Sequence, residues 1–377
     1  MKWRIGVGLM LIALLSASIT VQAEVDPSQM DFNPVDEVLE ESGAEEVMEE
    51  QTGSRSIGEL LEDLLSGAHT ADWKQWVRAF IDLLGGHVKE YVSLMIQVVA
   101  LAVLSRFFSG LELNFGEGSA GSIGFLCVYG VLVMLLLQSF QLAYEETREV
   151  LGRMQTVSLY MMPAMAAVAV AGGYALSSTL QSELMTGGFS LLLTVMKQII
   201  ATGILGVTII EIVNYISPRA VLSHLTSLVR TVLEKGMKAA CGLYLFLMGT
   251  CSVVAPAADK ALYKASSAVL SSVPVVGSAV SGAVESVMAG SMLVKNGIGA
   301  AGCMALLCLC LVPVARLTAI WLIYRLLAAF LAPVVDERVV KLLTVLARST
   351  AMLLGLLVGG VIIFTGAVGI FIMTTGH

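Results

Sequence analysis

Five polar or ionisable residues lie inside long apolar segments, where they could form a polar path through a membrane. They are Lys197, Gln198, Glu211, Arg316 and Arg325. A charge at bilayer depth costs about 2.5–3.5 kcal/mol on insertion scales, so it is rarely kept without a partner or a water path. One interpretation makes these residues the wet interior of a conduit. The other places Lys197 and Glu211 near helix ends and pairs Arg325 with an acid for assembly. The sequence leaves both open.

The sequence shows no motif for catalysis, metal binding or cofactor binding. The four histidines are scattered, without a cysteine or carboxylate at the spacing of a metal site. Neither a glycine-rich phosphate loop nor a nucleophile elbow occurs. The cysteines all lie in apolar segments, where free thiols behave as small hydrophobes; they are Cys127, Cys241, Cys251, Cys303, Cys308 and Cys310. We therefore expect no catalytic residue, no metal, no cofactor and no enzymatic activity.

The composition is typical of an integral membrane protein. Of the 377 residues, 57% are hydrophobic and 14% are charged, and the mean hydropathy is +0.85. Soluble domains carry about 25% charged residues. The net charge of −7 is unevenly distributed, because 14 of the 29 acidic residues lie between Glu24 and Asp63. The remainder is mildly basic, so nucleic acid is not expected as a partner.

Apolar segments of spanning length predict about seven transmembrane helices and an all-α, polytopic fold. A single pass needs about 20 apolar residues. The segments are Tyr91–Ser109, Ser122–Tyr144, Ser158–Leu176, Gly188–Ile212, Ala239–Ala258, Ile298–Pro333 and Thr350–Met373. Between them, Glu145–Thr156, Val221–Lys238 and Val335–Arg348 alternate apolar and charged residues at helical spacing. We expect these three stretches to form amphipathic helices at the membrane interface.

Small residues recur at four-residue spacing in two places. Read as a helix, Val273–Gly302 places Ser278, Gly282, Ser286 and Gly290 on one stripe, nearly opposite a stripe of valine and methionine. Membrane helices pack through such small residues, because lipid gives no hydrophobic drive toward association. This helix either packs tightly against another helix or lines a pore. A second step, Gly355 and Gly359, lies in the last apolar segment and is a helix-packing signal of the same kind.

The N-terminal part divides into three segments before the multi-pass domain, residues 91–377. Residues 1–23 resemble a secretory signal peptide, with Lys2 and Arg4, a short apolar run and a small-residue cleavage site. Residues 24–66 are acidic and are expected to form a disordered or loosely helical extracytoplasmic tail. Residues 67–90 carry tryptophans on one face and are expected to form an amphipathic interfacial helix.

The sequence gives conflicting signals about orientation. A cleaved signal peptide with seven passes makes the connectors 145–157, 214–238 and 334–349 face outward. These connectors hold nine Lys and Arg residues, and the inward connectors hold three. The positive-inside rule predicts the reverse. Either one of the apolar segments does not span, or the basic helices lie at the interface.

Three parts of the chain together resemble the stage III sporulation protein AE family of endospore-forming bacteria. They are the signal peptide with its acidic tail, the block Val273–Glu285 continuing to Leu293–Gly297, and Asp336–Leu343. The likeness covers nearly the whole chain, and the block from Val273 to Gly297 is its most specific part.

The resemblance implies a protein of the mother-cell membrane that surrounds the forespore. It implies a permease-like part of a multiprotein, feeding-tube-like channel between the two cells, needed for late forespore development. Implied partners are a secretion-type ATPase and the membrane and ring components of the same complex, together with the lipid bilayer. The family offers no catalytic residue to carry over.

Two other functions stay open. A stand-alone secondary transporter needs a substrate site at a broken helix near the membrane midplane, and Pro313–Arg325 is the candidate for it. A membrane scaffold would use its amphipathic helices to recruit soluble partners.

Overall fold

A computed structural model describes residues 32–66, 73–115, 120–171, 174–216, 223–270 and 277–374. Within its helices, the side chains of residues 255–270 and 277–290 lie outside the described set. The proposed signal peptide, residues 1–23, also lies outside the described residues, so it stays a prediction.

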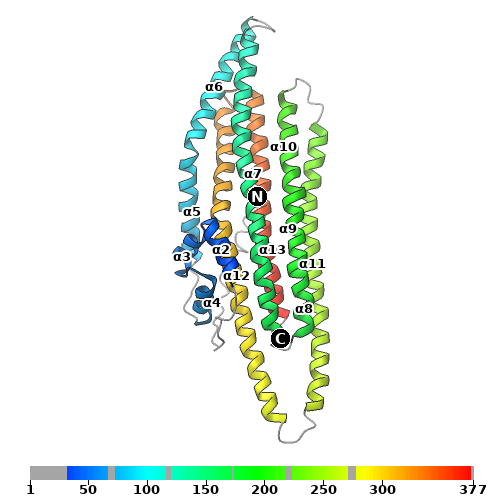
Figure 1. Ribbon diagram of the computed structural model, residues 1–377. Helices are drawn as coiled ribbons and strands as arrows, with labels where there is room; N and C mark the ends of the chain where they lie inside the picture. The colour runs from blue at the N-terminus through cyan, green and yellow to red at the C-terminus, as the bar shows by residue number, and fades with distance from the viewer. Residues whose placement is uncertain are drawn as a thin grey trace.

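Every regular element in these ranges is helical, and Figure 1 shows the long helices running side by side along one axis. Three short helices come first, and six longer or composite ones follow before the last. The elements are α2 Asn33–Ser42, α3 Ala44–Thr52, α4 Ile57–Ser66, α5 Trp73–Glu90, α6 Val92–Phe115, α7 Ala120–Ala171, α8 Ala175–Glu183, α9 Phe189–Val195, α10 Ala201–Ile216, α11 Ser223–Leu270, α12 Gly277–Leu331 and α13 Glu337–Thr374. Two π-helical turns, η2 (Leu184–Gly188) and η3 (Met196–Ile200), join α8, α9 and α10 into one rod.

Six helical segments of the described chain are long and apolar enough to cross a membrane. They are Val92–Gly110, Ile123–Val170, Ser177–Tyr215, His224–Val254, Ser291–Leu331 and Glu337–Thr374. The predicted fold class, an all-α polytopic membrane protein, is confirmed. The described residues contain six candidate spans, where the sequence predicted about seven.

The difference arises in α7, where Ser122–Tyr144 and Ser158–Leu176 had been expected as separate passes. The stretch between them has no proline and a single glycine, Gly152, so nothing in it forces a turn. Arg153 pairs with Glu149 at 2.8 Å, one helical turn away, which supports the helix through its charged middle. Charged residues separate two apolar segments in a hydropathy pattern. They do not end a helix, which continues until a helix breaker interrupts it.

The other two amphipathic stretches also belong to long helices, and each lies at the start of one. Val221–Lys238 overlaps the start of α11, and Val335–Arg348 overlaps the start of α13. No proline separates either stretch from the apolar segment that follows it. The expectation of separate interfacial helices is therefore corrected. Each charged stretch belongs to the same continuous helix, α11 or α13, as the apolar segment that follows it.

Both of these basic stretches lie at one end of the bundle. The Lys341 ammonium is 5.9 Å from the centre of the Tyr215 ring, so the start of α13 meets the end of α10. Arg230 contacts Ser349 near this end, and farther along the same two helices Leu245 approaches Gly366. Helices α11 and α13 therefore run parallel, and both begin at this end (Figure 1).

The core of the bundle is formed by α12 and α13. In the most apolar 18-residue window of each helix, 61% of α12 and 50% of α13 is buried, against 11% of α11 and 17% of α6. The Tyr324 hydroxyl on α12 lies 2.7 Å from Ser139 Oγ on α7, deep inside the bundle. Helices α6 and α11 therefore present most of their apolar surface outward.

The acidic segment was expected to be disordered or loosely helical, and the structure makes its described part helical and packed. Residues 33–66 form α2, α3 and α4, which lie against the flank of the bundle in Figure 1. Apolar side chains at helical spacing are fully buried there; they include Val35, Leu39, Met48, Ile57, Leu60 and Leu61. The high density of Glu hid this short apolar pattern, and burial against α7 and α12 offsets the ordering cost. We call these three helices the acidic cap.

Helix α5 falls within the segment expected as an interfacial amphipathic helix. It runs to Glu90 and lies beside α12, with Trp76 buried and Ile81 57% exposed. Its helical state agrees with the expectation, and its position at a membrane interface stays a prediction.

Candidate functional site

A buried polar cluster joins three membrane helices. It consists of Thr208 and Glu211 on α10, Arg230 on α11 and Ser349 on α13. Arg230 Nη2 donates to Glu211 Oε2 at 2.7 Å and lies 3.1 Å from Ser349 Oγ. Thr208 Oγ1 donates to Ser349 Oγ at 2.6 Å. The side chains of Arg230 and Glu211 are only 6% and 8% exposed. The cluster therefore supplies each buried charge with a partner, as a low-dielectric setting demands.

Glu211 was identified from the sequence, but its partners were not. Arg230 had been assigned to the polar face of an amphipathic interfacial stretch. In the structure it follows Thr226 by one helical turn and precedes Leu233 and Met237, which pack on the core. An arginine on the apolar stripe of a helix is the signal that could have found it, because a buried glutamate requires a cation.

A second ion pair connects α7 to α12. Arg316 Nη1 donates to Glu146 Oε1 at 3.0 Å, with 37% and 18% of the two side chains exposed. Arg316 was one of the predicted intramembrane residues, and Glu146 was not. This pair is more exposed than the buried polar cluster, so its two charges are less completely enclosed by protein.

The remaining predicted polar residues occupy other places. Lys197 and Gln198 lie in the π-helical turn η3, where Lys197 is partly buried and Gln198 is exposed. Such turns are frequent at functional sites. Arg325 is exposed, with its guanidinium 5.9 Å from the Trp321 ring centre. Across the described chain, no hydrogen bond or ion pair joins any two of the five predicted side chains.

The small-residue stripe of α12 is helical throughout. Ser278, Gly282, Ser286 and Gly290 all lie on α12, but their side chains are outside the described set. Their packing or pore-lining role therefore stays a prediction. Farther along the same helix, a Cβ placed on Gly302 would be 2.9 Å from Met161 Cε on α7, so the two helices approach closely there.

Gly355 and Gly359, the predicted packing glycines of α13, are not the positions where this helix approaches a neighbour most closely. A Cβ on Gly355 would meet no atom within 4 Å, and one on Gly359 would lie at 3.7 Å from Met196 Cε. The close approach is at Gly360, where an added Cβ would lie 2.7 Å from Met154 Cε. Packing through Gly355 and Gly359 stays a prediction, with Gly355 open to an external neighbour.

A family model described as stage III sporulation protein AE matches residues 55–375. The chain belongs to this family. The match confirms the resemblance expected from the sequence. It begins within the loop before α4, so α2 and α3 lie outside it.

A curated relative, stage III sporulation protein AE of Bacillus subtilis (strain 168), is 23% identical over 298 residues. The alignment covers 78% of this chain and 73% of the relative. No solved structure matches this chain. As a member of the stage III AE family, the protein is a multi-pass membrane protein involved in sporulation.

Proposed function

We propose that this protein is a membrane component of the multiprotein channel that links the mother cell to the forespore and supports late forespore development. The observation that carries the proposal is the family match over residues 55–375. The long apolar helices and their paired internal charges fit a protein that works within a membrane assembly.

The proposal extends to location and partners. The protein lies in the mother-cell membrane around the forespore and assembles with a secretion-type ATPase, other membrane proteins and ring components. The candidate partner-facing features are Gly355 on α13, where an added Cβ would meet no atom within 4 Å, and the small-residue stripe of α12.

The six-helix count supports a definite orientation. With residues 1–23 as a cleaved signal peptide and six crossings, the acidic cap is reached from the outer side of the membrane and residue 374 is on that side. The connectors 110–121, 214–238 and 334–349 then lie inside and carry seven Lys and Arg residues. The outward connectors 177–187 and 259–297 carry three. This distribution agrees with the positive-inside rule, which the seven-pass topology violated.

We propose two different roles for the intramembrane polar residues, according to whether they have a partner on another helix. Glu211 and Arg316, each with a partner on another helix, are proposed to hold helices together. Lys197 and Gln198, on the π-helical turn η3, are the better candidates for contact with a passing solute. The transporter alternative loses support, because α12 continues through Pro313 without a break.

The decisive experiment is purification from sporulating cells in mild detergent, followed by reconstitution in vesicles. Co-purification of other membrane proteins, together with solute flux that requires them, supports the channel role. Recovery of the chain alone with substrate-specific flux would instead establish a transporter. Capture of soluble proteins without flux would establish a scaffold.

The variant Lys197→Leu tests the conduit role within the same assay. We expect it to keep complex assembly and to reduce flux. Full assembly with full flux would remove Lys197 from the conduit.

A further inference from the structure

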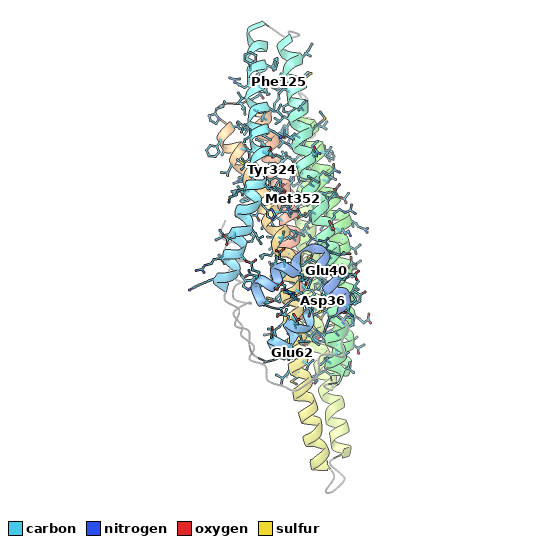
Figure 2. All side chains as sticks on the ribbon, turned by 60° about the vertical axis from the view of Figure 1, so that its left-hand side comes forward. Asp36, Glu40, Glu62, Phe125, Tyr324 and Met352 are labelled. Atoms are coloured by element: carbon cyan, nitrogen blue, oxygen red, sulfur yellow. The ribbon has the colours of Figure 1, made fainter. Side chains whose placement is uncertain are left out.

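The acidic cap lies along the flank of the bundle, at a depth where the long helices continue past it. Arg153 Nη2 on α7 donates to the Glu41 carbonyl oxygen on α2 at 3.5 Å. On α12, a Cβ placed on Gly297 would be 2.8 Å from Leu61 Cδ1 of α4. Figure 2 shows Asp36, Glu40 and Glu62 on this flank, with the α11–α12 hairpin extending beyond them.

The outer surface of the cap requires water. Eight of its carboxylates are exposed; they belong to Glu37, Glu40, Glu41, Glu46, Glu49, Glu50, Glu59 and Glu62. Charged side chains placed in lipid cost about 2.5–3.5 kcal/mol each at the bilayer centre. A lipid environment on this flank is therefore excluded on energetic grounds.

Contacts through the core place α11 at the same depth as the cap. Met154, next to Arg153, lies against Gly360 of α13. One turn along α13, the Phe364 ring centre is 5.6 Å from that of Phe189 on α9. Phe189 in turn lies 6.0 Å from Tyr244 on α11. A single layer thus runs from the cap across the bundle to α11.

The outer surface of α11 at this depth requires lipid or another apolar neighbour. Leu243, Phe246, Val253 and Val254 are 60%, 68%, 74% and 65% exposed. The segment Ala239–Ala258 carries no charge. At about 1.5 Å per residue its 20 residues extend about 30 Å, the thickness of a bilayer's hydrocarbon core. The length of this segment matches the thickness of the hydrocarbon core, and its uncharged composition is typical of a lipid-facing helix.

Neither lipid alone nor water alone can surround the chain at this depth, because the acidic cap requires water and the outer surface of α11 requires lipid or another apolar neighbour. We propose that at this depth the protein is a wall, with lipid on the α11 face and water on the acidic-cap face. Protein must separate the exposed carboxylates of the cap from lipid at this depth, and further copies of this chain do so in a cyclic assembly, which brings the same face of every copy to the axis. The inference deepens the proposed channel role by naming the surface that borders the passage.

Tryptophan quenching in vesicles tests the two faces separately. Phe246→Trp on α11 and Glu46→Trp on α3 are each placed in the full chain and compared with the parent chain, whose own tryptophans set the background. For Phe246→Trp we expect the added fluorescence to fall at least twofold in vesicles of dibrominated phosphatidylcholine and to resist iodide. Glu46→Trp should show the opposite pattern.

Two outcomes overturn the wall. Iodide quenching at position 246 without quenching by brominated lipid would mean that this half of the bundle projects into water. Lipid quenching at position 46 would put the cap in the membrane. Leu191→Trp on α9, a 66% exposed position, repeats the lipid-side measurement if Phe246→Trp fails to fold.

Closure by copies has its own test. Two differently tagged full-length versions are expressed together and purified through one tag. We expect the second tag to co-purify, and its absence would overturn closure by copies of this chain. These measurements need neither flux nor the other sporulation proteins, so their failure is distinct from failure of the proposed function.

Discussion

Arg230 and Glu211 meet across 2.7 Å in the interior of the bundle, and each belongs to a different membrane helix. Ser349 on a third helix completes the contact. The ion pair therefore fixes how α10, α11 and α13 fit together, and it accounts for a buried arginine in a stretch that looks amphipathic in sequence.

Removing one partner of this pair should be strongly destabilising. We expect Glu211→Ala to lower the free energy of unfolding by about 3–5 kcal/mol, because a buried arginine loses its counter-charge. The measurement is thermal or denaturant unfolding of the detergent-purified chain. The matched control is Glu337→Ala, which removes an exposed pair with Lys341 and should cost about 0.5 kcal/mol or less. Equal losses would contradict a special role for the buried pair.

Replacing both partners by apolar residues should be much milder. We expect Glu211→Leu combined with Arg230→Met to recover most of the stability that Glu211→Ala loses, since no unpaired charge then remains buried. A double variant as unstable as Glu211→Ala would show that the geometry of the cluster matters more than its charge balance.

The two neighbouring glycines of α13 should respond differently to bulk. Gly360→Leu must displace Met154 and should cost about 1–3 kcal/mol of stability. Gly355→Leu meets open space and should leave the isolated chain unchanged. If Gly355→Leu instead weakens co-purification of partner proteins, this glycine is an assembly contact. The measurements are thermal unfolding and tagged pull-down.

Docking of the acidic cap should strengthen as the pH falls. Burial raises the pKa of the Asp36 carboxyl above its usual range; the hydrogen bond from the Ile57 N–H lowers it, and the carboxylates of Glu45 and Glu59 raise it again. A raised pKa in the folded state means that protonation favours docking. This contribution is full below the unfolded pKa of Asp36 and is lost as pH rises through the folded one.

Hydrogen exchange of the α4 amides measures this effect. We expect slower intrinsic-rate-corrected exchange at pH 4 than at pH 7, and a smaller difference in Asp36→Asn. Faster exchange at pH 4 would contradict the assigned sign.

Arg316→Met should be less damaging than loss of Glu211. Its partner Glu146 keeps 18% of its side chain exposed, against 8% for Glu211, so the abandoned carboxylate is less completely buried. We expect a loss of about 1–2 kcal/mol, between the surface and buried cases. A loss as large as that of Glu211→Ala would mean that this part of α7 is sealed from water.

Composition and periodicity determined that the chain is a helical, multi-pass membrane protein, because an excess of apolar residues over spanning lengths has no other stable setting. The block from Val273 to Gly297, with the other matching parts of the chain, was likewise enough to indicate the family. Glu211 could also be singled out, since a carboxylate in an apolar run needs an explanation wherever it lies.

Tertiary structure alone decided what those residues contact. Glu145–Thr156 continues as helix, so α7 is one long helix where hydropathy predicted two separate segments. Arg230 becomes the partner of Glu211 only when α10 and α11 lie side by side. The acidic cap orders because α7 and α12 offer a surface for Leu39, Ile57 and Leu61. The ion pair and the docked cap are contacts between separate helices, which local composition does not encode.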